Sequence, residues 1–113
     1  MQLFLRIAPE LFLKRCVVGG IDRVFEINRN FRNEGMDRTH NPEFTVLEYY
    51  VAYKDYFWMM ETTEQLLEKT ALAVCGTTEV ILGDKTLSFK APFQRVSIFE
   101  AIQQHTGIDV SRM

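Results

Sequence analysis

The fold of this chain is decided by residues 23–53, RVFEINRNFRNEGMDRTHNPEFTVLEYYVAY. The stretch predicts two β-strands joined by a polar loop, from Glu34 to Glu43, that is too long for a tight hairpin turn. Side chains alternate between the two faces of a strand, so positions of equal parity share one face. The first strand is therefore predicted to have a polar even face and a largely apolar odd face. The polar positions are Glu26, Asn28, Asn30 and Arg32, and the apolar ones are Phe25, Ile27 and Phe31.

The second strand carries a carboxylate between aromatic residues. Its even positions include Phe44, Glu48 and Tyr50, which are expected to share one face. These residues face a first strand that continues into Arg32 and Glu34. A carboxylate between two rings, opposite further charges, predicts a pocket for a charged small molecule.

The connecting loop adds groups that suit an anion. His40 alone is more typical of a surface histidine, but Arg32, Arg38 and Asn41 accompany it. Guanidinium and imidazole donors match phosphate oxygens, so these residues predict an anion-binding cluster. The sequence has no Gly-rich phosphate loop, HExxH or GxSxG motif, and no His/Cys metal pair. A bound nucleotide would therefore have to be held by side chains and the sheet.

Composition sets the broad class. The chain has 113 residues, 47% of them hydrophobic and 25% charged, which is ordinary for one globular domain with a core. A net charge of -2 argues against an autonomous nucleic-acid-binding domain. Cys16 and Cys75 lack metal or redox spacing and are predicted to be buried free thiols. No apolar run spans a bilayer and no secretory signal follows Met1, so we expect a cytoplasmic protein without a membrane partner.

The N-terminal residues predict a strand and a short helix. Leu3, Leu5 and Ile7 alternate as in a strand, and Pro9 suits the first turn of a helix that starts at Glu10 and is stopped by Gly19-Gly20. A carboxylate at the N-terminus of a helix stabilises the helix by roughly 0.3 to 1 kcal/mol through its interaction with the helix dipole. Glu10 therefore has a purely structural explanation on these residues alone.

The C-terminal half predicts two helices and a hairpin, to which we assign no chemistry. With the central strands they give an α+β class, an antiparallel sheet with flanking helices. The predicted elements are a helix from Asp55 or Tyr56 to about Val74, strands 79–82 and 87–89 around the loop 83–86, and a helix from Ile98 to about His105 with Ser97 as its cap and Gly107 at its end. The early strand and the abrupt end after GIDV favour a piece of a larger protein over a complete small domain.

Three segments in the central stretch resemble motif 2 of the class II aminoacyl-tRNA synthetases. They are FRNE at 31–34, HNPEFT at 40–45 and LEYY at 47–50. With RIAPELFLKR upstream, the chain is similar to the lysyl-tRNA synthetases of that class, strongly over residues 3–56 and weakly beyond. The resemblance implies an antiparallel-sheet catalytic domain that uses ATP and Mg²⁺, activates lysine, transfers the lysyl group to tRNA(Lys) and forms a homodimer.

The resemblance also implies roles for five residues toward ATP. Arg32 is similar to the catalytic arginine that contacts the α-phosphate and the carboxylate of the amino acid together. Glu34 is similar to a residue that orients the adenine end, and His40 to one that reaches the terminal phosphates. Asn41 is similar to a residue that meets the adenine, and Phe44 to the ring on which adenine stacks, worth about 1 kcal/mol.

Three further residues resemble those that hold lysine, together with Arg32. They are Glu10, Glu48 and Tyr50, and the resemblance now outweighs the helix-dipole explanation for Glu10. A substrate with two ammonium groups and one carboxylate requires at least two carboxylates and an arginine, which this chain supplies. Which carboxylate binds which ammonium group stays open.

Parts of the family pattern lie outside this sequence. Motif 1, motif 3 with the acidic Mg²⁺ ligands, and the anticodon-binding domain are absent. We interpret residues 1–113 as a single partial catalytic domain, with a motif 2 region at about 23–53 and a helix and hairpin region at about 55–113, and expect it to be inactive alone. Two alternatives stay open: a paralogue that attaches a lysine-type amino acid to an elongation factor, and a non-catalytic, synthetase-like regulatory module.

Overall fold

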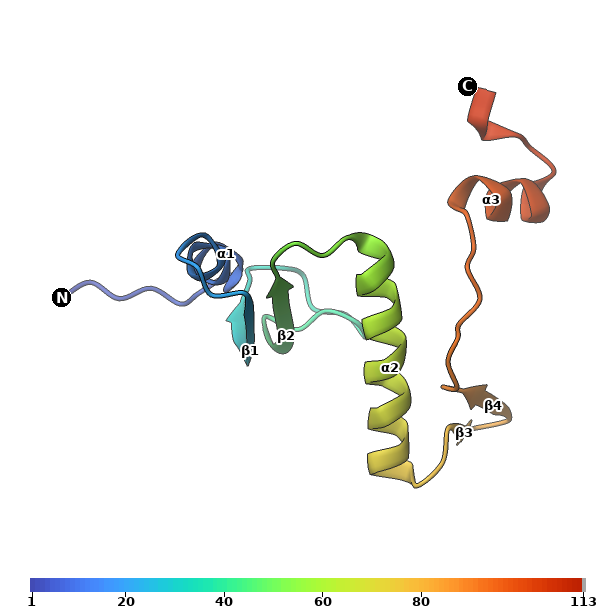
Figure 1. The fold of residues 1–113 in the computed structure, drawn as a ribbon, viewed down its shortest axis with the longest axis horizontal. Helices are drawn as coiled ribbons and strands as arrows, with labels where there is room; N and C mark the ends of the chain where they lie inside the picture. The colour runs from blue at the N-terminus through green and yellow to red at the C-terminus, as the bar shows by residue number, and fades with distance from the viewer. Residues whose placement is uncertain (113) are drawn as a thin grey trace. The chain divides into compact units, whose positions relative to one another are not determined.

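The computed structural model describes residues 1–112, and the side chains of residues 1–111. These residues form a mixed α+β structure, which confirms the predicted class (Figure 1). Two compact units, Met1–Lys54 and Asp55–Met113, are described separately. The first holds α1 (Glu10–Val18), β1 (Arg23–Phe31) and β2 (Glu43–Val51); the second holds α2 (Tyr56–Cys75), β3 (Glu79–Leu82), β4 (Lys85–Ser88), α3 (Ile98–Thr106) and η1 (Val110–Arg112).

The two long strands form an antiparallel pair whose register confirms the predicted faces. Pairing runs from Arg23 opposite Val51 to Phe31 opposite Glu43, so even positions always face even positions. Phe44, Glu48 and Tyr50 therefore share the face of Glu26, Asn28 and Asn30. The loop between the strands, residues 32–42, is long, as expected.

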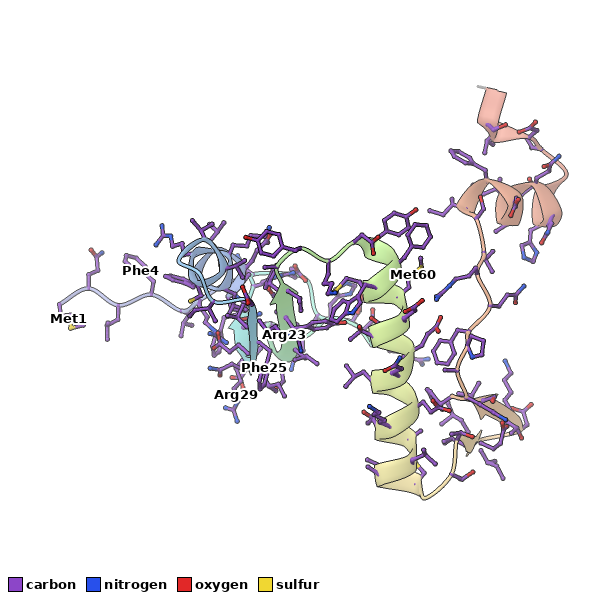
Figure 2. All side chains as sticks on the ribbon, viewed as in Figure 1. Met1, Phe4, Arg23, Phe25, Arg29 and Met60 are labelled. Atoms are coloured by element: carbon purple, nitrogen blue, oxygen red, sulfur yellow. The ribbon has the colours of Figure 1, made fainter. Side chains whose placement is uncertain are left out.

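The polar face of this pair is the covered one. Helix α1 packs against both strands, and Asn30 is fully buried, with 0% of its surface exposed. The odd face is open, because Phe25 and Ile27 are 69% and 63% exposed (Figure 2 labels Phe25). Burial in the first unit thus places charged and amide groups, rather than a purely apolar layer, between helix and sheet.

Two predictions are wrong, one for the N-terminal segment of the first unit and one for the cysteines, of which each unit holds one. Residues 3–7 form no strand, because one backbone hydrogen bond joins them to β1, in which the Phe31 N–H donates to the Arg6 carbonyl at 2.8 Å. A strand needs a partner along its length. The cysteines are free, but neither is buried: Cys16 is half-buried and Cys75, the last residue of α2, is exposed.

The second unit confirms its predicted elements, with shifted edges. The hairpin turn contains only Gly83 and Asp84, since β4 starts at Lys85, and Gly83 adopts a φ of 64° that suits a two-residue turn. Helix α2 buries Ala71 and also Glu64, which forms an ion pair with Arg95. Within residues 1–112, no helix has the length and apolar character needed to cross a membrane.

The two N-caps of the second unit differ in a testable way. The Asp55 carboxylate accepts a hydrogen bond from the Trp58 N–H at 3.0 Å, whereas Ser97 occupies the cap position of α3 without a side-chain cap bond. Asp55→Ala is expected to destabilise the first turn of α2 by about 1 kcal/mol, and Ser97→Ala to have a clearly smaller effect on α3. Amide hydrogen exchange at both helix starts in the full-length protein measures this, and equal acceleration at both would contradict the capping role of Asp55.

Candidate functional site

A concavity of about 310 Å³ lies at the end of the strand pair where the long loop begins and ends. It is lined by all five residues predicted to meet a nucleotide, and by Thr39 in addition. The lining residues are Arg32, Glu34, Thr39, His40, Asn41 and Phe44. Arg38, which the sequence grouped with this cluster, is exposed and is not among the lining residues. The structure thus brings together the whole predicted set except Arg38.

Arg32 is held at the mouth of the loop by three contacts. It follows the last residue of β1, and its backbone N–H donates to the Pro42 carbonyl at 2.9 Å, which ties the two ends of the loop together. Its Nε donates to the Ile7 carbonyl at 3.3 Å, and the guanidinium carbon lies 5.2 Å from the centre of the Phe44 ring. This geometry favours a cation–π contact and leaves the two terminal nitrogens for an anion.

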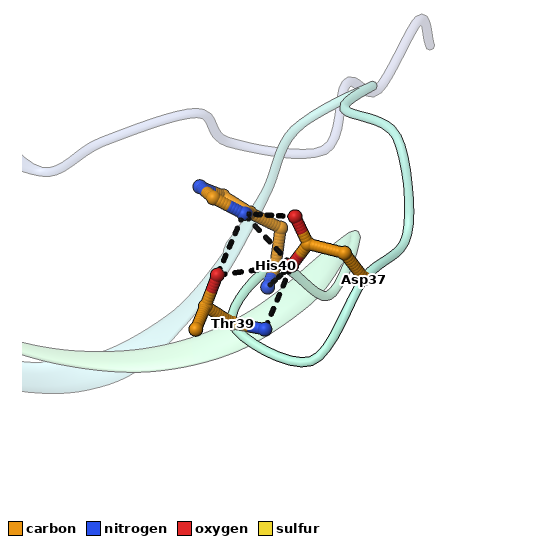
Figure 3. A network of polar contacts seen from close by, with 3 residues as sticks. All are labelled: Asp37, Thr39 and His40. Atoms are coloured by element: carbon orange, nitrogen blue, oxygen red, sulfur yellow. Dashed lines mark hydrogen bonds and ion pairs between the residues drawn. The ribbon is translucent and has the colours of Figure 1, made fainter.

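A carboxylate organises the loop around His40 (Figure 3). Asp37 Oδ1 accepts backbone hydrogen bonds from Thr39 and His40, both at 2.7 Å, and the Thr39 hydroxyl donates to it at 3.0 Å. The His40 Nδ1 atom lies 2.9 Å from Asp37 Oδ1. One carboxylate therefore fixes both the backbone turn and the imidazole ring, as an Asx turn does.

The same contacts explain the acidity of Asp37. The backbone N–H of Thr39, followed by the side chains of His40 and Thr39, holds the pKa of the Asp37 carboxyl below its usual range. The sequence analysis missed the positioning roles of Asp37 and Thr39. The signal was available as an Asp two residues before a Thr and three before a His, a spacing typical of a side-chain-capped turn.

The residues predicted to hold lysine gather under helix α1. The Tyr50 hydroxyl donates to Glu48 Oε2 at 3.0 Å. Glu10, at the start of α1, forms an ion pair with Lys14, whose ammonium group lies 5.6 Å from the centre of the Tyr50 ring. Burial, followed by the hydrogen bond to Glu48 and the charges of Glu48 and Glu10, raises the pKa of Tyr50 to about 12, so the hydroxyl stays protonated as a donor at neutral pH.

The chain's own Lys14 ammonium group lies in this cluster. The Lys14 ammonium lies against the Glu10 carboxylate and over an aromatic ring, an arrangement that suits a primary amine. A free amine ligand would meet Glu10 in competition with Lys14. Within the described residues Glu48 forms no ion pair, and its hydrogen bond to Tyr50 fixes one carboxylate oxygen.

Each cluster contributes residues to the even face of β2, Phe44 from the first and Glu48 and Tyr50 from the second. Phe44 and Glu48 are four residues apart on β2, which corresponds to about 13 Å along an extended strand. One elongated ligand, with a ring system at one end and an amine at the other, can span this separation. The Arg32 guanidinium lies beside Phe44, 5.2 Å from the centre of its ring.

Comparison with known families decides the relationship. A family model described as tRNA synthetases class II (D, K and N) matches residues 1–113, the whole chain. The chain belongs to the class II tRNA synthetases. The predicted family is therefore confirmed on the full length of the chain rather than on the central stretch alone.

Curated relatives of this class II synthetase chain include three bacterial proteins named lysine–tRNA ligase. The protein of Porphyromonas gingivalis is 65% identical over 113 residues, covering 100% of this chain and 20% of the relative. That of Christiangramia forsetii is 62% identical over 98% of this chain and 20% of its own length. That of Acinetobacter baylyi is 62% identical over 93% of this chain and 21% of its own length. The chain thus spans about a fifth of the relatives that it matches.

Within residues 1–112, no group of three or more His, Cys, Asp or Glu side chains is placed to hold a metal ion.

Proposed function

We propose that this chain is the motif 2 part of a lysine–tRNA ligase, and that residues 1–113 form one partial catalytic domain of it. The observation that carries the proposal is the concavity in which Arg32, Glu34, His40, Asn41 and Phe44 converge. The names of the relatives support lysine as the amino acid, since every relative compared here is a lysine–tRNA ligase. The activity, its partners and a cytoplasmic location belong to the longer protein.

The concavity would hold ATP without a Gly-rich loop. In this proposal adenine stacks on Phe44, with Glu34 and Asn41 at its polar edge, and His40 meets the terminal phosphates from the turn that Asp37 fixes. The terminal nitrogens of Arg32 bind the α-phosphate and the lysine carboxylate together. A planar guanidinium suits this role because it presents two parallel donors to each oxyanion.

The even face next to α1 would hold lysine. Glu10, Glu48 and the Tyr50 hydroxyl supply two carboxylates and one oriented dipole for a substrate that carries two ammonium groups. The Tyr50 hydroxyl donates to Glu48 and so fixes the carboxylate before the substrate arrives. Positioning charges in advance in this way reduces the reorganisation that binding requires.

Activation then follows from alignment. The lysine carboxylate oxygen attacks the α-phosphorus of ATP, a carboxylate–phosphorus bond forms, the bond to the β-phosphate bridge breaks, and pyrophosphate leaves. The 3′-terminal hydroxyl of tRNA(Lys) later attacks the lysyl carbonyl carbon, and AMP leaves. Arg32 lowers the first barrier by holding both reactants and stabilising the charge on the α-phosphoryl oxygens. Mg²⁺ ligands and the dimer interface are proposed to lie in other parts of the protein.

The lysine-dependent exchange of pyrophosphate into ATP tests the proposed function. The full-length protein is expected to catalyse this exchange with lysine and to charge tRNA(Lys). Exchange with lysine accompanied by labelling of an elongation factor, and not of tRNA, would instead identify the paralogue. Absence of any amino-acid-dependent exchange would favour the regulatory module.

The Asp37 turn gives a prediction specific to ATP. Asp37→Ala removes the acceptor for two backbone N–H groups and the partner of the His40 ring. We expect the KM for ATP to rise about tenfold, with a change of less than about twofold in the KM for lysine, because the turn borders only the nucleotide side.

Steady-state exchange kinetics in the full-length protein measure both constants. Asp84→Ala is a matched control, since Asp84 also lies in a turn but in the hairpin of the second unit. Equal increases in both constants for Asp37→Ala would contradict a role confined to the nucleotide side.

A further inference from the structure

A carboxylate outside the predicted site lies directly opposite Glu48. The register of the strand pair places Glu26 of β1 across from Glu48 of β2, on the same face. Directly opposed residues have Cβ atoms about 5 Å apart, and like charges in that position repel. Lysine binding at Glu48 therefore depends on how the charge of Glu26 is balanced.

Arg6 balances that charge. Its Nη1 forms an ion pair with Glu26 Oε1, and Asn28 Nδ2 donates to the same oxygen at 3.1 Å. These two donors, Arg6 first, hold the pKa of Glu26 below its usual range. The Arg6 and Glu26 side chains are 28% and 30% exposed, so solvent screens the pair only in part.

The backbone holds Arg6 in register with β1. Its Nε donates to the Arg29 carbonyl at 2.9 Å, and its own carbonyl accepts from the Phe31 N–H at 2.8 Å. Its Nη2 is buried and has no hydrogen-bond partner within the described residues. The negative charge that pairs with this guanidinium is that of Glu26. Arg6 precedes Glu10 by four residues, and the same contacts therefore anchor the segment that leads into α1.

We propose that Arg6 and Glu26 form a positioning pair for the lysine site, in which each keeps the other away from Glu48. The inference rests on the proposed function and adds two residues to it. With both present, Glu26 is neutralised by Arg6, and Glu48 is left to the substrate ammonium group. Neither residue touches the substrate, and their effect on lysine passes through Glu48.

The charges predict an unusual pattern of mutant effects. Arg6→Met leaves Glu26 as an unbalanced carboxylate opposite Glu48, where it competes for the ammonium group and repels its neighbour. Glu26→Gln leaves the Arg6 guanidinium without its partner, free to pair with Glu48 in place of lysine. The double variant Arg6→Met/Glu26→Gln removes both charges and leaves Glu48 undisturbed. Each single change is therefore harmful, while the two together are mild.

The test measures KM values for lysine and ATP by exchange kinetics in the full-length protein. We expect each single variant to raise the KM for lysine about tenfold with less than about a twofold change for ATP, and the double variant to lie within about threefold of the unsubstituted protein. Arg29→Met is the matched control, because Arg29 is an exposed arginine of β1 paired with Glu43 at 3.2 Å, and it is expected to change neither constant.

The outcomes separate the two levels of the proposal. If the unsubstituted protein shows no lysine-dependent exchange, both the proposed function and this inference are wrong. If that protein is active but the double variant is as impaired as the worse single variant, Arg6 serves only as packing and the inference is wrong. If Arg6→Met fails to fold, the comparison of Glu26→Gln with the double variant still tests the inference. A lower KM for lysine in the double variant than in Glu26→Gln requires coupling between the charges of Arg6 and Glu26.

Discussion

Arg32→Ala in the full-length protein is expected to lower the rate of lysine-dependent exchange by about a thousandfold or more. Arg32 lies over Phe44 in the concavity, and its terminal nitrogens are the groups that we propose to bridge the α-phosphate and the lysine carboxylate. A contact that strengthens as charge builds on the α-phosphoryl oxygens affects the rate more than binding. Pre-steady-state formation of lysyl-adenylate measures the step directly.

Two further variants sharpen this result. Arg32→Lys keeps the charge but loses the planar pair of donors. We therefore expect it to lower the rate of lysine-dependent exchange, but by less than Arg32→Ala does. Arg38→Ala is the matched control, because Arg38 is an exposed arginine of the same loop that does not line the concavity. An unchanged exchange rate in Arg32→Ala would remove Arg32 from the reaction.

Glu48→Gln is expected to raise the KM for lysine about a hundredfold, with less than about a threefold effect on the KM for ATP. The substitution preserves shape and an acceptor for the Tyr50 hydroxyl, which donates to Glu48 at 3.0 Å, so the loss reports on charge. Lysine titrations at fixed ATP, and the converse, give the two constants.

The control for this variant lies on the same strand. Glu43→Gln removes a carboxylate from the exposed odd face of β2, where Glu43 pairs with Arg29, and is expected to leave both constants unchanged. Equal effects of Glu48→Gln on lysine and ATP would contradict a role in binding the substrate amine.

The alternation of polar and apolar residues in β1 and β2 was sufficient to predict which strand residues share the covered face. Strand parity alone placed Phe44, Glu48 and Tyr50 on one face, and the register confirms it. Helix ends marked by glycine were also predictable, as Gly107 with a φ of 75° at the end of α3 illustrates. Such features depend on local backbone preferences, which a sequence carries directly.

Contacts between distant residues were not predictable in the same way. The ion pair of Arg6 with Glu26 joins positions 20 residues apart, and no local pattern specifies it. The alternation of Leu3, Leu5 and Ile7 predicted a strand, but strand formation depends on a pairing partner, and the backbone of this segment contacts β1 only near Arg6. Local propensity is overridden when that partner is missing.

The structure of the full-length protein with a non-hydrolysable lysyl-adenylate analogue tests the central claim most directly. We expect the adenine against Phe44, the linkage between the lysyl and nucleotide parts within hydrogen-bond distance of Arg32, and the side-chain ammonium group of the lysyl part at Glu48 and Tyr50. An analogue bound away from the even face of β1 and β2, or one whose amine contacts neither Glu10 nor Glu48, would contradict it.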